Sequence, residues 1–501
     1  MSFLKIFQIS TYGLFFIYVF AFSAILNAVF LRCKINVMES YIKRDKEKEK
    51  PKEVYKIVFL HPDLGIGGAE RLIVDAAVSL QNQKKLPVSV VIVTNRHQPE
   101  RAFPETVDGT LKVEVRASFL PSSIFGFCKS LCATVRMMCA AFLTCWAYPD
   151  TDAFIVDQVS TALPVLDYFA PHTPRLFYCH FPDQLCDGNR KADNTLVARA
   201  PGHHNYRKVM NAIEHYGMTK ASRVLCNSHF SMDVSLRTFP LIKELVSADP
   251  LYPPVTPQVT IPDTLEEPSQ RVLNTVTSFT TFVSINRYER KKNIKLAIDA
   301  FHETIHRTDL KWDKPPFLII AGGYDSKLSE NKEYEAELRT YALETLKIRD
   351  DQISFLRNIS AVTKEIILTH MYALIYTPEN EHFGIAPVEA MLRGKPVVAV
   401  NHGGPVESVK DLLKCPEEAA GILAPPTVKD FSDAMARLVA DKTLYAQLGR
   451  QGKTRAETEF STTHCGLKLI EIVEELCSKA EVTISKVLAE KNGTEKKEKK
   501  E

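Results

Sequence analysis

The sequence predicts an α/β protein with two doubly wound parallel sheets, each covered by helices on both faces. Three observations lead to this prediction. Short β-branched runs alternate with helical stretches, they form two series along the chain, and a proline-rich segment without periodicity separates the series. A length of 501 residues also exceeds one ordinary hydrophobic core, which favours two or three domains.

The composition excludes several classes of protein. Apolar residues make up 45% and charged residues 25% of the chain, as in ordinary globular proteins. A formal net charge of +3 does not indicate a nucleic-acid partner. The eleven cysteines form no C-x-x-C pair and no Cys/His metal spacing, so we expect reduced thiols in a cytosol-facing protein and no zinc.

The N-terminus predicts a membrane anchor. No residue from Ile6 to Leu31 is charged, and a helix of this length at about 1.5 Å per residue exceeds a hydrocarbon core of ~30 Å. A cleaved signal peptide is the alternative, although its apolar region would be shorter and no small-x-small site precedes Arg32. Lysines and arginines concentrate after this stretch, which places the bulk of the chain in the cytosol. Residues 1–53 are therefore interpreted as anchor and charged linker.

The first series of strands and helices occupies residues 54–250. A helix is predicted from Glu70 to Gln81, where apolar residues recur at helical spacing. Residues 124–148 form a second long apolar stretch, which contains Lys129 and Arg136. Two unpaired cations argue against a lone membrane span, so a core or interfacial helix is expected, with bilayer contact as the alternative. The predicted strands are residues 55–60, 87–94, 111–117, 153–159, 174–180 and 222–228.

The second series occupies residues 273–460 and follows a linker at 251–272. An amphipathic helix at 461–480 and a disordered charged tail at 481–501 complete the chain. Lys497 and Lys499 in that tail also match a K-x-K-x-x retrieval pattern. Open α/β sheets bind ligands at the carboxyl ends of their strands, so two such domains facing each other predict a cleft for two substrates. The predicted strands are residues 280–286, 316–323, 353–358, 373–378, 395–400 and 420–426.

Two loops carry groups that suit an anionic ligand. Gly67 and Gly68 in "GIGGAER" leave backbone amides accessible before a helix, although the segment is neither G-x-G-x-x-G nor a Walker loop and also fits a plain turn. Arg287, Lys291 and Lys292 follow the first strand of the second series, where cations would face a diphosphate. A solvated basic turn is the alternative for this second loop.

A third loop places two carboxylates around a helix start. Glu381 follows a predicted strand, and Glu389 lies in the next helix, which has Pro387 in its first turn. Between the acids lie the unpaired amides of Phe383, Gly384 and Ile385. This arrangement is suited to the hydroxyls of a sugar and a ribose, whereas the alternative is a helix-capping glutamate pair.

Together these motifs resemble the family-4 retaining glycosyltransferases of the GT-B fold. The resemblance rests on the E-x7-E pair, the R-x4-K pair and the glycine loop, and it spans residues 55–480. "HPDLGIGGAERL", "YCHFPD", "INRYERKKN" and "EHFGIAPVEAM" are similar to the eukaryotic α-1,3/1,6-mannosyltransferases of the dolichol pathway. The chain departs from the family at Asn286 and Asn293, where glycine is usual, and neither change removes a charge.

The resemblance implies two Rossmann-like domains facing a cleft, with the acceptor on the first domain and GDP-mannose on the second. It implies transfer of α-1,3- and then α-1,6-linked mannose to dolichyl-diphosphate-linked Man-GlcNAc-GlcNAc, with the catalytic domains on the cytosolic face of the endoplasmic reticulum membrane. It also implies association with other dolichol-pathway glycosyltransferases. A mannosyltransferase that extends a longer lipid-linked chain, or a scaffold without turnover, are the alternatives.

The resemblance also implies roles for the motif residues. Arg287 and Lys292 would bind the donor diphosphate, with Lys291 as an alternative to Lys292. Glu389 would hold the ribose, and Glu381 with the three amides would orient the mannose. His180 would meet the sugar from the other domain. Gly67 and Gly68 would lie against the diphosphate or the acceptor.

We expect an electrostatic mechanism without a cofactor or bound metal. Fixed cations stabilise a departing diphosphate directly. Asp150 and Asp152 form a D-x-D pattern, but they precede their strand and so lie at the wrong end for a nucleotide-bound cation. With no evident carboxylate nucleophile, the family's retention favours front-face transfer. Asp157, at the end of a strand, is a candidate contact for the acceptor.

Overall fold

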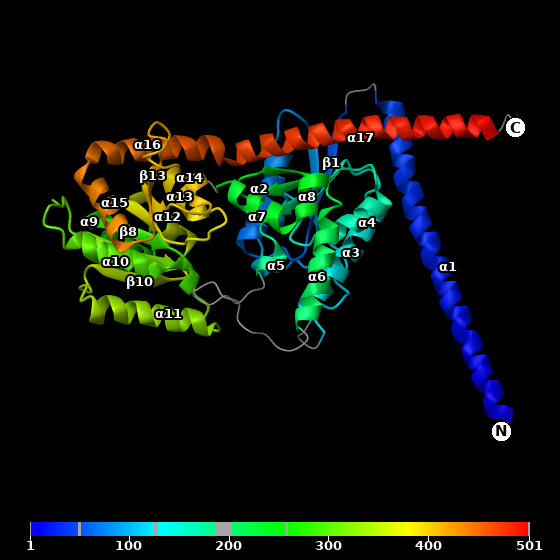
Figure 1. Ribbon diagram of the computed structural model, residues 1–501, viewed down its shortest axis with the longest axis horizontal. Coiled ribbons are helices and arrows are strands. Elements are labelled where there is room, and N and C mark those ends of the chain that lie inside the picture. The colour runs from blue at the N-terminus through cyan, green and yellow to red at the C-terminus, as the bar shows by residue number, and fades with distance from the viewer. Residues whose placement is uncertain (1, 49–51, 125–127, 187–202, 256–258, 499–501) are drawn as a thin grey trace.

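A computed structural model describes residues 2–48, 52–124, 128–186, 203–255 and 259–498. Within these ranges it does not describe the side chains of residues 2–22, 186, 203, 204 and 491–498. The described chain forms two parallel sheets, each with helices on both faces (Figure 1). The predicted fold class is therefore confirmed for the two sheets.

The first sheet has seven parallel strands in the order β3-β2-β1-β4-β5-β6-β7. Its register places Ile57 of β1 between Val90 of β2 and Ala153 of β4, so apolar side chains stack across neighbouring strands. All six predicted strands are confirmed, and β7 adds a short edge. The strands are β1 Tyr55–His61, β2 Val88–Thr94, β3 Lys112–Val115, β4 Ala153–Asp157, β5 Arg175–Cys179, β6 Arg223–Cys226 and β7 Ser247–Pro250.

Two hydrophobic cores cover the faces of this sheet. One core contains Phe154 and Met137, and the other contains Phe59 and Leu72. Both cores also take residues from the ends of the chain, because Val37 packs in the first and Ile470 in the second. The helices are α1 Ser2–Glu47, α2 Gly68–Gln81, α3 Lys129–Ala147, α4 Ala162–Phe169, α5 Asp183–Cys186, α6 His203–Met218, α7 His229–Thr238 and α8 Pro240–Leu245.

The second sheet has six parallel strands in the order β10-β9-β8-β11-β12-β13. Its six strands match the six predicted runs, and the central strands are mostly apolar, as expected for strands buried on both faces. The strands are β8 Thr280–Ile285, β9 Pro316–Gly322, β10 Ile353–Arg357, β11 Ala373–Tyr376, β12 Val397–Val400 and β13 Gly421–Ala424. The helices are α9 Glu267–Ser278, α10 Ile294–Ile305, α11 Ser329–Thr340, α12 Ala361–His370, α13 Ile385–Leu392, α14 Pro405–Ser408, α15 Val428–Ala440, α16 Lys442–Glu459 and α17 Thr462–Glu498.

The last two helices connect the two sheets. In Figure 1, α16 lies over the second sheet and α17 runs from there across the first sheet. At their junction the amide of Val255 donates to the carbonyl of Phe460 over 2.8 Å. Two parts of the chain therefore connect the sheets: the segment that precedes α9, and the pair of helices α16 and α17. The proposed domain boundaries at 250, 272 and 460 stay predictions.

The prediction of a disordered tail from residue 481 is wrong for its first part. Helix α17 continues to Glu498, and Ile484 is buried against the core of the first sheet with Leu488 beside it. Ser485 also donates to Asp45 of α1 over 2.5 Å. Cys477, Ile484 and Leu488 repeat at helical spacing, so the apolar stripe extends beyond the point at which the charged residues begin to dominate.

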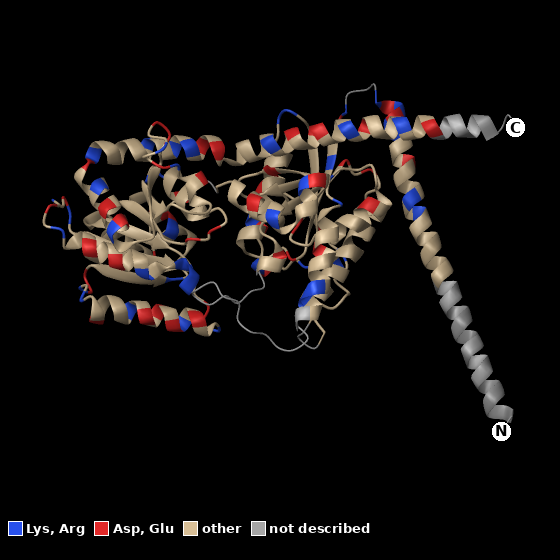
Figure 2. Ribbon diagram, in the orientation of Figure 1, with Lys and Arg blue, Asp and Glu red and all other residues tan. Residues whose placement is uncertain are grey.

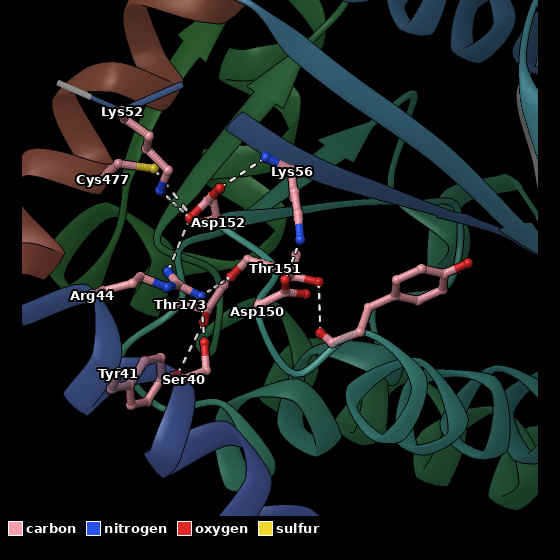
Figure 3. Close-up of polar contacts among 11 residues, drawn as sticks. Ser40, Tyr41, Arg44, Lys52, Lys56, Asp150, Thr151, Asp152, Thr173 and Cys477 are labelled. Carbon is pink, nitrogen blue, oxygen red and sulfur yellow. Dashed lines mark hydrogen bonds and ion pairs between the residues drawn. The ribbon is translucent and has the colours of Figure 1, made fainter. Parts of the chain in front are cut away.

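Helix α1 is fixed to the first sheet by an ion-pair cluster around Asp152, which is 3% exposed (Figure 3). Arg44 reaches one carboxylate oxygen over 3.0 Å, Lys52 pairs with the same oxygen, and the amide of Lys56 donates to the other over 2.8 Å. The basic residues after the predicted anchor are therefore not all solvated. Two of them position α1 on the protein.

Replacing Asp152 with asparagine is expected to lower the free energy of unfolding by about 2–4 kcal/mol, because two partly buried cations lose their counter-charge. The matched control is Asp150→Asn. Asp150 is 45% exposed and pairs with Lys56, so its loss should cost less than about 1 kcal/mol. Chemical denaturation of both variants measures the difference. Equal effects would contradict the assignment of Asp152 as the centre of the cluster.

Among the described side chains, one helix is long and apolar enough to cross a membrane, and it is α3. Met137, Ala140 and Ala141 of α3 are buried in the core of the first sheet. Leu131 and Val135 are among its exposed residues, so α3 keeps an apolar outer face. Most side chains of the predicted membrane span, Ile6 to Leu31, lie outside the described part of the structure, so this span stays a prediction. Figure 2 shows few charges on α3.

Candidate active site at the carboxyl ends of the strands

The centre of the site is an ion pair between Lys292 and Glu381, which are 18% and 20% exposed. Lys292 ends a 3-10 turn, Arg290–Lys292, that follows β8, and Glu381 lies in the loop after the neighbouring β11. Asn293 takes a left-handed backbone with φ of 47°, a conformation that glycine and asparagine tolerate best. Asparagine is therefore compatible with the backbone at this position.

The electrostatics of the pair favour its charged form. Burial raises the pKa of Glu381, but the charge and hydrogen bond of Lys292 outweigh it, so the pKa lies below the ordinary value. Tyr376, at the end of β11, is hydrogen bonded to the Glu381 carboxylate. Burial raises the pKa of Tyr376 well above its ordinary value, so the phenol keeps its proton and donates it to the carboxylate. Glu381 is therefore an oriented anion.

Glu389, in the first turns of α13, has one free oxygen. Its Oε1 accepts from Lys364 over 2.6 Å, whereas Oε2 is buried and has no hydrogen-bond partner in the described structure. A buried unpaired carboxylate oxygen is costly unless a ligand or water completes it. The negative charge of Glu389 also acts on Tyr376, so both acids lie near that ring. The geometry fits a carboxylate that accepts hydrogen bonds from hydroxyls.

The loop between the acids has a conformation that requires glycine. Gly384 has φ of 82°, and a Cβ there would lie 3.2 Å from the Tyr376 ring. The side chain of Phe383 points into the interior, where it packs on Tyr252 and Phe460. The amides of Phe383, Gly384 and Ile385 donate to no described residue. The predicted donor set is thus a set of backbone groups, and the Phe383 side chain has a packing role.

The other two cations of the basic run point outward. The Arg287 and Lys291 side chains are 71% and 75% exposed, and both face Glu289, over 3.6 Å and 3.1 Å. Glu289 is only 15% exposed. The structure therefore separates Lys292, which is held inside the site, from Lys291, which is on the surface. The stem of Arg287 lies close to the backbone of Gly323 after β9, and its guanidinium is on the surface.

His180, predicted from "HFPD", follows β5 of the first sheet. Its Nε2 lies 3.0 Å from Oδ2 of Asp157, the last residue of β4. Asp157 has no exposed surface, and its Oδ1 lies 2.7 Å from Nδ1 of His61. The interpretation of Asp157 as an acceptor contact is therefore wrong, because both of its oxygens are occupied by histidines.

The two lobes meet at His382, the residue after Glu381. Its ring stacks on Phe181 of the first lobe with centroids 3.9 Å apart, and its carbonyl accepts from Ser228 over 2.5 Å. A second contact is made by Glu407, which accepts from the amide of His229 over 2.8 Å. The pKa of His382 is lowered to about 4, mainly by burial; the charge of Glu381 opposes this shift and the charge of Lys292 adds to it. Phe181 directly follows His180 in the chain, so the contact between the lobes brings His180 near the loop that contains Glu381.

The stability of the protein should depend on pH through His382. Its pKa in the folded state, about 4, lies below the ordinary 6.5, so its contribution is fully present above pH 6.5. Between pH 6.5 and 4 the unfolded chain binds a proton that the folded chain does not, and the contribution, at most about 3 kcal/mol, is lost. We expect His382→Gln to remove this part of the pH dependence in unfolding titrations. The exposed His402→Gln is the control and should keep it.

The glycine loop lies apart from the ion pair. Gly67 caps α2 with an extended backbone, and a Cβ there would meet the carboxylate of Glu70. Nothing within 4 Å limits a side chain at Gly68. Beside this loop is a small pocket of about 90 Å³, which includes Arg96 and Arg101 in its lining. No contact in the described structure joins Gly67 or Gly68 to the second lobe, so their predicted role stays a prediction.

Sequence reasoning missed four residues of the site: His61, Glu289, Tyr376 and His382. His61 had a signal, because it ends a strand within the glycine-loop motif. Tyr376 also ends a strand, but only the fold shows its hydrogen bond to Glu381. His382 could not be identified from the sequence, because its contacts are with residues of the opposite lobe.

Known proteins resemble this chain in sequence and in fold. The family "Glycosyl transferases group 1" matches residues 266–455, the part that contains both acids and all three cations. The alpha-1,3/1,6-mannosyltransferase ALG2 of Kluyveromyces lactis is 39% identical over 77% of this chain and 78% of its own length. The chain belongs to the ALG2 mannosyltransferase family. The members from Dictyostelium discoideum and Mus musculus are 36% and 35% identical, over 85% and 84% of this chain and 100% and 96% of their own.

Solved structures support the fold of this ALG2 family member. Sucrose-phosphate synthase from Thermosynechococcus elongatus matches with a TM-score of 0.63 at 16% identity, over 85% of this chain and 100% of that one. Anabaena HepE in complex with UDP and glucose matches with a TM-score of 0.57 at 19% identity, over 84% and 100%. The two parallel sheets therefore form a GT-B glycosyltransferase fold, and the protein is an α-1,3/1,6-mannosyltransferase.

Proposed function

We propose that this enzyme transfers mannose from GDP-mannose to dolichyl-diphosphate-linked Man-GlcNAc-GlcNAc, first through an α-1,3 and then through an α-1,6 linkage, in N-glycan precursor assembly. The observation that supports the donor site most strongly is the partly buried ion pair between Lys292 and Glu381, next to the unpaired Oε2 of Glu389. A cation for phosphate, an acid for a hexose and a free acid for a ribose lie at one edge of one sheet.

Each residue has a chemical task in this proposal. Lys292 and the exposed Arg287 bind the diphosphate of the donor and neutralise the charge that grows on it as the glycosidic bond breaks. Preorganised groups of this kind typically contribute ~3–4 kcal/mol each to the transition state. Glu389 accepts hydrogen bonds from the ribose hydroxyls through Oε2. No step of the proposal uses a cofactor or metal ion.

The hexose lies between the two lobes. Glu381 and the free amides of Phe383, Gly384 and Ile385 orient it from the second lobe, and His180 contacts it from the first. The small pocket beside Gly67 and Gly68 belongs to the acceptor lobe and offers Arg96 and Arg101 to acceptor phosphates. Transfer then occurs on the face from which the diphosphate leaves, which retains the configuration of the sugar.

The proposed location is the endoplasmic reticulum membrane, with both lobes on the cytosolic face. This proposal is supported by the uncharged stretch from Ile6 to Leu31, by the basic residues that follow it, and by the exposed apolar face of α3. The Asp152 cluster holds α1 on the first lobe, so the same lobe would lie nearest the lipid-linked acceptor. Association with other dolichol-pathway glycosyltransferases is part of the proposal.

Purified protein with labelled GDP-mannose and a synthetic phytanyl-diphosphate-linked Man-GlcNAc-GlcNAc acceptor tests the proposal. We expect two successive additions of mannose, the first α-1,3 and the second α-1,6. Transfer only to longer acceptors would indicate a different mannosyltransferase of the same pathway. No transfer from any nucleotide sugar would indicate a scaffold. Addition of unlabelled UDP-glucose or UDP-GlcNAc as competitor should leave the rate unchanged, whereas unlabelled GDP-mannose should lower the incorporation of label.

A further inference from the structure

Three residues outside the donor lobe form one hydrogen-bonded array. His61 ends β1, Asp157 ends β4, and His180 follows β5, and these three strands are neighbours in the first sheet. Carboxyl ends of parallel strands meet at one edge, which places the three side chains next to each other. The array starts in the interior at His61 and ends at His180, which is 23% exposed.

Both nitrogens of His61 carry a proton. Nε2 lies 3.0 Å from the carbonyl oxygen of Asp63, and a carbonyl only accepts hydrogen bonds. Nδ1 lies 2.7 Å from a carboxylate oxygen of Asp157, which also accepts. Burial lowers the pKa of His61, but the charge of Asp157 outweighs it and the pKa lies above the ordinary value. The buried pair is therefore an imidazolium and a carboxylate, with no net charge.

The second oxygen of Asp157 fixes His180. Burial raises the pKa of Asp157, but the two histidines have the larger, opposite effect, so the pKa lies below its ordinary value. The carboxylate therefore stays ionised and accepts the hydrogen of His180 Nε2. The other ring nitrogen, Nδ1, then carries a lone pair. It has no hydrogen-bond partner among the described residues. The adjacent residue, Phe181, stacks on His382, so this nitrogen belongs to the region where the lobes meet.

We propose that His61 and Asp157 are positioning residues, which hold His180 in one orientation with its proton on Nε2, so that Nδ1 accepts a hydrogen bond from a hydroxyl of the donor hexose. This inference rests on the proposed function of the site. His61 supplies a second hydrogen bond that prevents the Asp157 carboxylate from rotating. Because His61 neutralises Asp157, the buried pair brings no net charge next to His180.

The variant Asp157→Asn tests this arrangement, because an amide cannot accept hydrogen bonds from both histidines. We expect kcat with GDP-mannose to fall by about 10- to 100-fold, as for other residues that orient a functional histidine. The affinity for GDP, which lacks the hexose, should stay unchanged. In the His180→Ala background Asp157→Asn should have no further effect on kcat. A full additional loss in that background, or a matching loss of GDP affinity, would overturn the proposal.

A second measurement does not depend on the Asp157→Asn variant. Nitrogen-15 NMR of histidine-labelled protein, with His180→Ala to assign the signal, reports which ring nitrogen of His180 is protonated. We expect Nε2–H in the wild type at neutral pH, and a proton on Nδ1 would overturn the proposal even if Asp157→Asn fails to fold. This readout does not depend on transfer. A wild type with the expected tautomer but no use of GDP-mannose would instead contradict the proposed function.

Discussion

Replacing Lys292 with alanine is expected to reduce mannosyl transfer by about 10²- to 10³-fold, the largest effect of any single substitution in the site. The variant loses the cation that meets the departing diphosphate. It also leaves the partly buried Glu381 without its counter-charge, so that a negative group lies unpaired where the anionic donor must bind. Single-turnover transfer from GDP-mannose at saturating donor measures the loss in the chemical step.

The adjacent Lys291 provides the matched control. Its side chain is 75% exposed and pairs with Glu289, so Lys291→Ala should change the rate by only a few-fold at most. This comparison also decides between the two lysines that the basic run offers for the diphosphate. A larger loss from Lys291→Ala than from Lys292→Ala would reverse the assignment that the structure makes.

Replacing Glu389 with alanine is expected to weaken donor binding by about 10- to 100-fold, because hydrogen bonds to a charged acceptor contribute about 1.5–3 kcal/mol. The loss should be seen in KM for GDP-mannose and in the Kd of GDP alone, since the ribose is common to both. The kcat should change little, because the contact with the ribose is the same in the ground state and the transition state.

Glu379→Gln is the control for the second acid. Glu379 is an exposed carboxylate in the same loop and accepts from Asn293 over 3.3 Å, so its loss should leave KM within a few-fold of the wild type. A fall in kcat with unchanged GDP affinity in Glu389→Ala would place Glu389 at the reacting sugar instead of the ribose.

The fold could be predicted well from the sequence because the central strands of both sheets are buried on both faces. Such strands are mostly apolar runs, and all twelve predicted runs, including those of the more exposed edge strands β3 and β10, are strands in the structure. The edge strand β7, with the sequence "SADP", has no such run and was missed. The extent of α17 was underestimated because charged residues conceal the buried Ile484 and the packed Leu488.

The sequence was enough to predict which charged residues belong to the site, but not which of them are buried or contact each other. Lys292 and Glu381 follow adjacent strands of one sheet, so their proximity follows from the fold class. In the same basic run, burial separates Lys292 from Arg287 and Lys291, and burial depends on tertiary packing. The link between Asp157 and its two histidines depends on the order of strands β1, β4 and β5, which no local pattern reveals.

A structure with GDP bound tests the central proposition most directly. We predict that the diphosphate lies within hydrogen-bond distance of Lys292 and that the ribose hydroxyls reach Oε2 of Glu389. Density for GDP along the first sheet, or anywhere that leaves both side chains without contact to the nucleotide, would contradict the assignment of the second lobe as the donor site.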